Sequence, residues 1–296
     1  MTSPTAAVAF VGLGNMGIPL SRRLVEAGHA VAGYDVSGDA RRRASEHGVR
    51  EAASLGEVVT GAGLLILMLP GSDAVAAVLS DTTLLERIEP DALVIDMSSS
   101  EPLRTRDMAA SLRAHGIKMI DAPVSGGVAG AEKGTLTVMV GGEKTDLARA
   151  STYLERMGRV VHAGPIGSGH AVKALNNLLS ATHLWITSEA MIAGERFGID
   201  PQVLLSIFNS SSGRSGSTEN KWPNFILPGT FNSGFGIRLM VKDMNIAVEL
   251  TEQVGVPSGL GSEALALWSR AAEGLPPTAD HTEIARFIGA GAGPGG

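Results

Sequence analysis

Lys173 and Asn177, a lysine and an asparagine four residues apart, are the pair whose types and spacing most directly suggest proton chemistry. On a helix, positions i and i+4 share one face, so the two side chains could hold a hydroxyl or carbonyl oxygen between them. Gly169 predicts that such a helix starts shortly before Lys173. The positive end of the helix dipole and partial burial would both lower the pKa of the lysine. We predict that Lys173 exchanges a proton with an alcohol or ketone near neutral pH; a surface lysine is the alternative.

Two further segments offer polar groups to a ligand. Ser125-Gly126-Gly127 follows a predicted strand, and the unobstructed N–H groups beside its glycines suit a carboxylate or another small oxyanion. An ordinary Ser-Gly-Gly loop is the alternative for this segment taken alone. Lys242-Asp243 interrupts an apolar helical run and either reaches a cofactor or partner domain or is simply solvated.

The N-terminal part of the chain has the spacing of a dinucleotide-binding turn. A β-branched and aromatic run at residues 8–11 leads into G-x-G-x-x-G, and a helical pattern follows. The first glycine allows the tight turn, the second lets the backbone approach a pyrophosphate, and the third lets the helix pack close to the strand. The N–H groups and positive dipole end of the helix favour phosphates. We expect cofactor contacts from Gly12, Leu13, Gly14, Asn15, Met16 and Gly17.

Asp35 indicates which dinucleotide binds. It ends a second predicted strand, at residues 30–34, where a carboxylate accepts hydrogen bonds from the adenosine ribose and repels a 2′-phosphate. The sequence therefore predicts NAD rather than NADP. Two alternatives stay open: Asp35 only caps the next turn, or an arginine of the run 41–43 turns toward a 2′-phosphate.

The strands that would position these groups have continuous apolar character, which is typical of parallel strands buried on both faces of a doubly wound sheet. Their C-terminal ends carry turn residues and would line the ligand crevice. The predicted strands are residues 7–11, 30–34, 64–69, 92–95, 118–120, 136–140 and 160–162.

Helical spacing replaces these runs beyond about residue 164. We predict an α/β Rossmann domain at residues 1–163, with a mostly parallel sheet, and an all-α domain at residues 164–296. The tail at 289–296 contains only glycine, alanine and proline and is predicted to be disordered. The helical signals are the repeat of Val172, Leu175, Leu179, Thr182 and Ile186, and the segments 201–209, 239–254 and 262–272.

Composition excludes several classes of protein. A length of 296 residues suits two domains, and a net charge of −6 argues against a nucleic acid or an anionic membrane as the main partner. The absence of cysteine excludes disulfides, thiolate metal sites and cysteine nucleophiles, and the seven scattered histidines suggest no metal site. The apolar run 64–69 is too short to span a bilayer, and residues 1–6 show no signal pattern. We expect a cytoplasmic protein.

Ordered motifs along nearly the whole chain resemble the β-hydroxyacid dehydrogenases, the group of 3-hydroxyisobutyrate dehydrogenase and tartronate semialdehyde reductase that is related to 6-phosphogluconate dehydrogenase. Several such motifs in order are far more specific than any one alone. They are the glycine-rich turn at 12–17, Met68-Leu69-Pro70, residues 121–127, Gly169 with Lys173 and Asn176-Asn177, residues 211–214, and Leu239-Met240-x-Lys242-Asp243.

The resemblance implies NAD-dependent interconversion of a small β-hydroxyacid, similar to 3-hydroxyisobutyrate, with its semialdehyde or ketoacid by hydride transfer. It also implies a Rossmann domain followed by a helical domain that often interlocks with a partner subunit, so a homodimer or homotetramer is expected. The implied roles are Lys173 as general acid/base, Ser125, Gly126, Gly127 and Asn177 as contacts of the carboxylate-bearing substrate, and Leu69, Pro70, Ser98 and Lys242 as contacts on the cofactor side.

The chain also departs from the family pattern, which leaves the substrate open. Ala74 stands where mammalian-type 3-hydroxyisobutyrate dehydrogenases carry asparagine, and the segments 217–222 and 280–284 differ from theirs. Two alternatives remain: an imine reductase-like NADPH enzyme on the same scaffold, and a non-catalytic dinucleotide-binding module. Either would be expected to lack the lysine at position 173.

Overall fold

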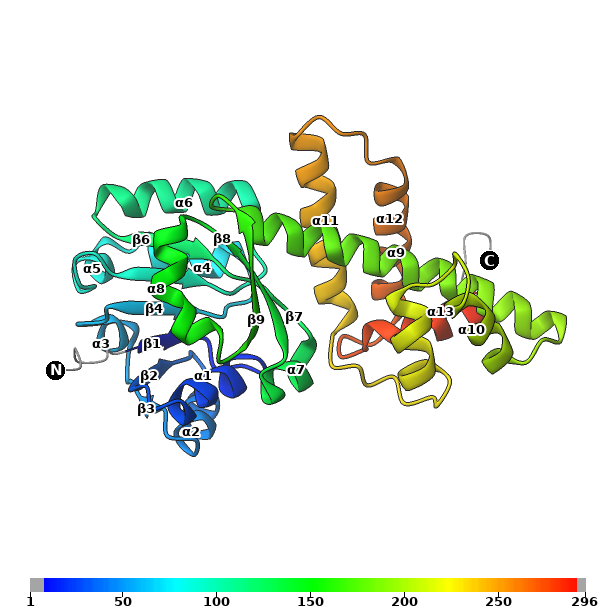
Figure 1. Ribbon diagram of the computed structural model, residues 1–296, viewed down its shortest axis with the longest axis horizontal. Helices are drawn as coiled ribbons and strands as arrows, with labels where there is room; N and C mark the ends of the chain where they lie inside the picture. Colours follow the sequence, from blue (N-terminus) through cyan, green and yellow to red (C-terminus); the bar gives the residue numbers. More distant parts are fainter. Residues whose placement is uncertain (1–7, 292–296) are drawn as a thin grey trace. The chain divides into compact units, whose positions relative to one another are not determined.

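The computed structural model describes residues 8–291, which form two compact units that divide after Lys173 (Figure 1). The N-terminal segment 1–6 lies outside the described residues, as do residues 292–296 of the tail predicted to be disordered. Within that tail, Gly289 ends a helix, and Ala290 and Gly291 follow in a turn.

The first unit is built on a nine-stranded sheet with the order β3-β2-β1-β4-β5-β6-β8-β7, and β9 pairs with β8. The strands from β3 to β6 are parallel, whereas β8 runs antiparallel to β6 and β7. The two-residue strands β3 and β7 lie outside the predicted set because they are too short to show a pattern. The strands are β1 (Val8–Val11), β2 (Val31–Tyr34), β3 (Arg50–Glu51), β4 (Leu64–Leu67), β5 (Leu93–Asp96), β6 (Lys118–Asp121), β7 (Val124–Ser125), β8 (Leu136–Gly141) and β9 (Gly158–Gly164).

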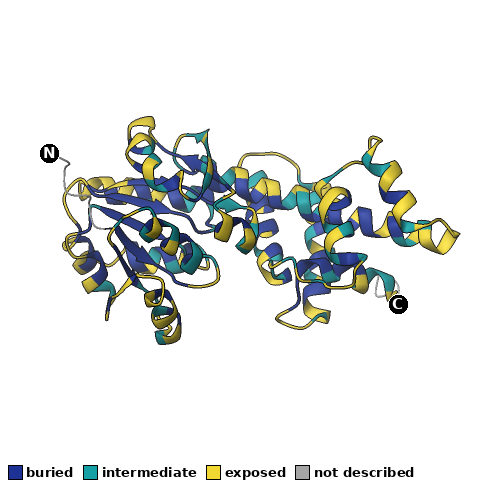
Figure 2. Cartoon of the chain, turned by 60° about the horizontal axis from the view of Figure 1, so that its bottom comes forward, coloured by how far each residue is buried: buried dark blue, intermediate teal, exposed yellow. Residues whose placement is uncertain are grey.

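Helices cover both faces of this sheet, so its central strands β1, β4 and β5 are buried on both sides (Figure 2). Alternate residues of β1 show this directly, since Val8 and Phe10 pack into one apolar cluster and Ala9 and Val11 into the other. The predicted doubly wound, mostly parallel sheet is confirmed. The helices of this unit are α1 (Gly17–Glu26), α2 (Gly38–Ser45), α3 (Leu55–Val59), α4 (Ser72–Leu79), α5 (Thr82–Leu85), α6 (Pro102–Ala114), α7 (Gly127–Lys133) and α8 (Lys144–Leu154).

The second unit is helical and begins within the long helix α9 (Ser168–Phe197). Its core gathers three tryptophans, Trp185, Trp222 and Trp268. The helices predicted near 201–209, 239–254 and 262–272 are present, whereas the π-helix η1 is not signalled by the sequence pattern. The further elements are α10 (Pro201–Asn209), η1 (Ser217–Ile226), α11 (Ile237–Gln253), α12 (Gly259–Gly274), the 3₁₀ turn η2 (His281–Glu283) and α13 (Ile284–Gly289).

The apolar repeat that predicts α9 lies on the exposed side of the helix. Its side chains Val172, Leu175, Leu179 and Ile186 are between 37 and 59% exposed, whereas a second stripe that includes Ala181 and Leu184 is buried. Periodicity identifies the helix, but it does not say which of two apolar stripes packs within the chain.

Asp280 is a central hydrogen-bond acceptor of the helical unit. Its carboxylate accepts hydrogen bonds from the Ser233 hydroxyl, from the backbone N–H groups of Gly234 and Phe235, and from both the N–H and the hydroxyl of Thr282. Burial alone would raise the pKa of Asp280, but its contacts with His281 and Thr282 outweigh burial and hold the pKa far below the usual range. The charged form therefore ties the segment before α11 to the one that leads into α13.

We predict that Asp280→Asn lowers the free energy of unfolding at pH 7 by about 1–3 kcal/mol, because several donors, among them the two of the buried Thr282, lose a charged acceptor. A depressed carboxyl pKa stabilises the fold above the unfolded-state pKa, near 4, and this contribution is lost as the pH falls toward the folded-state value. The difference between variant and wild type should therefore shrink below about pH 4. Denaturant titrations at several pH values measure it, with the exposed Glu273→Gln as control. An equal difference at pH 3 and pH 7 would contradict this account.

Candidate functional site

The glycine-rich turn between β1 and α1 is shaped by close backbone contacts. Gly12 has φ +98°, and a Cβ there would overlap the carbonyl group of Met68. A Cβ on Gly17 would overlap the carbonyl group of Gly12. Both positions therefore need glycine for packing, whereas nothing lies within 4 Å of a Cβ on Gly14.

The turn leaves the start of α1 open to an anion. Gly14 and Asn15 are exposed, and the N-cap residue Met16 makes no side-chain capping hydrogen bond. The first N–H groups of a helix lack intrahelical partners and attract phosphates. Because β1 lies between β2 and β4, this turn is also at the point where the strand order reverses, which is where doubly wound folds bind dinucleotides. These residues fit the pyrophosphate of a dinucleotide.

Asp35 follows β2 and fastens the glycine-rich turn. Its Oδ2 accepts a hydrogen bond of 2.7 Å from Leu13 N, and its Oδ1 accepts one of 2.8 Å from Ser37 N. Two arginines of the run 41–43, which could have bound the 2′-phosphate of NADP, form contacts within the chain instead. Arg41 donates to the Asp35 carbonyl and to Glu51, and Arg42 pairs with Asp39. This arrangement favours NAD, because a carboxylate faces the turn and these two guanidinium groups are held elsewhere.

The ends of β4 and β5 are joined through a buried serine. Ser98 is 1% exposed, and its Oγ accepts a hydrogen bond of 2.9 Å from the backbone N–H of Leu69. The structure thus brings Leu69 and Ser98 together, with the exposed Pro70 beside them. The Ser98 hydroxyl fixes the backbone that follows β4, and Leu69 and Pro70 lie at the surface of the sheet edge there.

The predicted carboxylate-binding loop lies after β6. Ser125 ends β7 and pairs with Thr137 of β8, and Gly126 (φ +132°) and Gly127 (φ +64°) lead into α7. Gly126 is exposed, and its two neighbours are half-buried. The left-handed backbone at both glycines turns the chain sharply between β7 and α7.

Lys173 lies near the start of α9, as predicted, and is only 9% exposed. A lysine of this exposure is not an ordinary surface residue, so that alternative is wrong. Lys173 is the last residue of the first unit, whereas Asn177 and Lys242 belong to the second.

Asn177 and Lys242 are brought together by Asp243, for which a solvated pair with Lys242 was one of two alternatives. Asp243 is 2% exposed; its Oδ2 accepts a hydrogen bond of 2.6 Å from Asn177 Nδ2, and its Oδ1 lies 3.1 Å from Lys242 Nζ. The signal was its spacing, because Asp243 is three residues after Met240 and four before Ala247, both of which are buried in α11. It therefore lies on the inward face of that helix.

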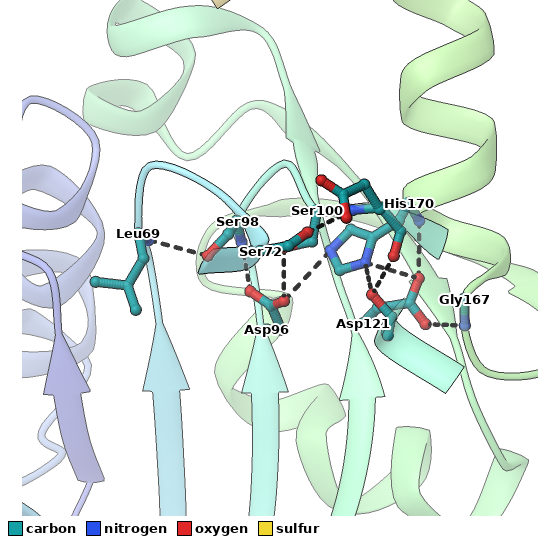
Figure 3. Close-up of polar contacts among 10 residues, drawn as sticks. Leu69, Ser72, Asp96, Ser98, Ser100, Asp121, Gly167 and His170 are labelled. Atoms are coloured by element: carbon teal, nitrogen blue, oxygen red, sulfur yellow. Dashed lines mark hydrogen bonds and ion pairs between the residues drawn. The ribbon is translucent and has the colours of Figure 1, made fainter. Parts of the chain in front are cut away.

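Three further buried polar residues were not predicted as site residues: Asp96, Asp121 and His170, each fully or almost fully buried (Figure 3). The Nδ1 atom of His170 lies 2.9 Å from the hydroxyl oxygen of Thr105. Within residues 8–291, no group of His, Asp and Glu side chains could hold a metal ion. None of the helices in the described part of the chain combines the length and apolar character needed to cross a bilayer.

The chain matches two family models that together cover most of its length. Residues 7–167 match the NAD-binding domain of 6-phosphogluconate dehydrogenase, and residues 167–288 match the NAD-binding domain of NADP-dependent 3-hydroxyisobutyrate dehydrogenase.

Relatives and solved structures agree with these matches. The chain is 39% identical to a probable mitochondrial 3-hydroxyisobutyrate dehydrogenase of Dictyostelium discoideum, over 90% of this chain and 86% of that protein. It is also 39% identical to an NAD-dependent L-serine dehydrogenase of Pseudomonas aeruginosa, over 88% and 90% of the two chains. The structure of Mycobacterium tuberculosis 3-hydroxyisobutyrate dehydrogenase with L-serine superposes with a TM-score of 0.90 and 34% identity, over 96% and 99% of the chains.

The predicted resemblance is thereby confirmed along both units. Three observations lead to one assignment. They are the dinucleotide-binding turn where the strand order reverses, the helical unit after it, and the matches over nearly the whole length. The chain belongs to the β-hydroxyacid dehydrogenase family.

Proposed function

We propose that this NAD-dependent oxidoreductase interconverts a small β-hydroxyacid, similar to 3-hydroxyisobutyrate, with its semialdehyde or ketoacid, and that Lys173 is the general acid/base. The observation that carries the proposal is the buried Lys173 near the start of α9, in the same unit as the dinucleotide-binding turn. A non-catalytic module or an imine reductase on this scaffold gives no reason to bury a lysine there.

Lys173 would hold and move the proton of the substrate hydroxyl. An amine Nζ can accept a proton from a hydroxyl group and, as the ammonium, return it. In the oxidation direction, Nζ would take the hydroxyl proton, the electron pair of the O–H bond would form the C=O bond, and the carbinol hydrogen would leave with the C–H pair as hydride. NAD, when bound, accepts that hydride. In the reverse direction, the lysine ammonium returns the proton to the carbonyl oxygen.

The remaining site residues would bind and orient. Ser125, Gly126 and Gly127 would hold the substrate carboxylate with their hydroxyl and backbone N–H groups. Asn177 would contact the substrate hydroxyl, and its hydrogen bond to Asp243 holds its amide in one orientation. Lys242, which pairs with the same carboxylate, would lie on the cofactor side.

The dinucleotide would be held along the carboxyl edge of the sheet. The turn residues Gly12, Leu13, Gly14, Asn15, Met16 and Gly17 would receive the pyrophosphate, and Asp35 would bind the adenosine ribose. Leu69, Pro70 and Ser98 would border the nicotinamide half, with Ser98 acting through its hydrogen bond to the Leu69 backbone. A cytoplasmic location stays a prediction from the sequence.

A substrate panel tests the reaction class. The acids are 3-hydroxyisobutyrate, 3-hydroxypropionate, L-serine, glycerate and threonate, each with NAD and with NADP. L-serine is included because one relative is named as an L-serine dehydrogenase. We expect reduction of NAD with at least one acid, and a lower kcat/KM with NADP because Asp35 repels the 2′-phosphate. Turnover with NADP alone would contradict the role of Asp35, and no turnover with any acid would contradict the proposed substrate class.

Lys173→Ala tests the mechanism. We expect kcat to fall by about 10²–10⁴-fold, the usual contribution of a general acid/base, while the dissociation constant of NADH stays close to that of the wild type. Steady-state kinetics and NADH fluorescence measure the two effects. The exposed lysine variant Lys144→Ala is the control and should keep wild-type values. Turnover near the wild-type rate in Lys173→Ala would contradict the role of Lys173 as general acid/base.

We also infer that a second copy of the chain covers the exposed stripe of α9, formed by Leu175, Leu179 and Ile186. Side chains spaced by about one or two helical turns form a continuous apolar surface, which monomeric proteins rarely leave exposed. Leu179→Lys should shift the protein toward monomer in light scattering. The control is Glu195→Lys, an exposed position on the other side of the same helix. A wild-type protein that is monomeric at high concentration would contradict this inference.

A further inference from the structure

We propose that His170 is a positioning residue for the reaction: its buried imidazole, held between the ends of β5 and β6, fixes the first turns of α9 and thereby places Lys173. All the contacts that carry this proposal lie within the first unit (Figure 3). The proposal rests on the acid/base role of Lys173 given above.

Asp121, the last residue of β6, binds the start of α9. Its Oδ1 accepts a hydrogen bond of 2.6 Å from Gly167 N, and its Oδ2 accepts one of 2.8 Å from His170 N. A carboxylate beside the first N–H groups of a helix satisfies donors that have no intrahelical partner and complements the helix dipole. The sheet therefore fixes the backbone where α9 begins.

The His170 side chain adds a second attachment to the same turn, through α6 and β5. Nδ1 lies 2.9 Å from Thr105 Oγ1, and Nε2 lies 3.7 Å from Asp96 Oδ2. A proton on Nε2 is attracted to that carboxylate, whereas a lone pair there would be repelled. The Thr105 hydroxyl also donates to the carbonyl oxygen of Glu101, 3.0 Å away, so the direction of its contact with Nδ1 depends on the imidazole tautomer.

Asp96 connects this histidine to the edge that would border the nicotinamide. Its Oδ1 accepts a hydrogen bond from Ser98 N, and its Oδ2 accepts one from the Ser100 hydroxyl. Ser98 in turn holds the Leu69 backbone. A continuous series of polar contacts thus runs from the end of β4, through the end of β5, to the first turn of α9.

The energetics favour a positioning role over simple stabilisation. The side chains of Asp96, Asp121 and His170 are all inaccessible to solvent. Burial of ionisable groups carries a desolvation cost that their mutual attraction often only balances, so apolar packing would stabilise a core at least as well. Directional hydrogen bonds, unlike apolar packing, define one rotation of the helix about its axis and one position along that axis.

Lys173 is three residues beyond His170, on a neighbouring position of the same side of α9. A tilt or slide of the first turn would therefore move the lysine with it. Displacement of a catalytic group by about 1 Å can cost a factor of about 10² in rate.

The test uses His170→Leu, its conservative partner His170→Gln, and Thr105→Val, which removes only the hydroxyl near Nδ1. We expect kcat to fall by about 10- to 100-fold in His170→Leu, with partial recovery in His170→Gln, and a displaced pH profile of kcat. The dissociation constant of NADH and the KM of the hydroxyacid should change by less than about threefold. If His170→Leu does not fold, Thr105→Val carries the test, with a smaller loss of kcat in the same direction.

The exposed His115→Gln is the control and should match the wild type in every measurement. A merely structural role would lower the melting temperature but leave kcat and its pH profile unchanged in the folded protein, and that result would overturn the proposal. Lys173→Ala, measured in parallel, separates the two inferences. Near-normal turnover in Lys173→Ala would contradict the general acid/base role of Lys173. Loss of turnover in Lys173→Ala, with wild-type kcat in the His170 variants, would contradict only the positioning role of His170.

Discussion

The attachment of α9 to the end of β6 is the constraint on which the proposed chemistry depends. Asp121 closes its strand and accepts hydrogen bonds from Gly167 N and His170 N, so the sheet itself determines where the helix begins. Lys173 follows within two turns, and its place in the first unit is set by that beginning. A flexible loop in this position would leave the lysine free to sample many places. A helix start that is capped by a carboxylate holds Lys173 in one position.

The parallel order of the strands explains why so many polar residues gather at one edge. The strands β1, β4, β5 and β6 are neighbours and run in the same direction, so the residues that follow them share one end of the sheet. The glycine-rich turn, Leu69, Ser98 and Asp121 are far apart in sequence but close in this arrangement. The buried carboxylates Asp96 and Asp121 satisfy backbone N–H groups where the strands end, and this allows irregular backbone to be packed beneath a ligand edge.

Sequence reasoning predicted what depends on local spacing. The glycine-rich turn, the two-sided apolar strands and the helix bearing Lys173 follow from the positions of a few residue types, and the structure and the comparisons confirm the fold and family. The functions of Asp121 and Asp243 could not be predicted with the same ease, because each acts on a partner distant in sequence. Asp96 accepts local hydrogen bonds from Ser98 and Ser100, but its contact with His170 is equally distant in sequence. Only Asp243 left a local signal, its place on the apolar face of α11. The exposed stripe of α9 was hidden for another reason, since periodicity does not distinguish a face buried within the chain from one left exposed.

Two of the departures from the family pattern, the segments 217–222 and 280–284, interact with each other. The segments 217–222 and 280–284 lie in the helical unit, and they contain Lys221 and Asp280. Burial lowers the pKa of Lys221, while the negative charge of Asp280 opposes that shift, so the two side chains interact electrostatically. Lys221 also lies over the ring of Phe225, which partly offsets the loss of water around its ammonium group. A change at either segment therefore alters the charge balance of the other.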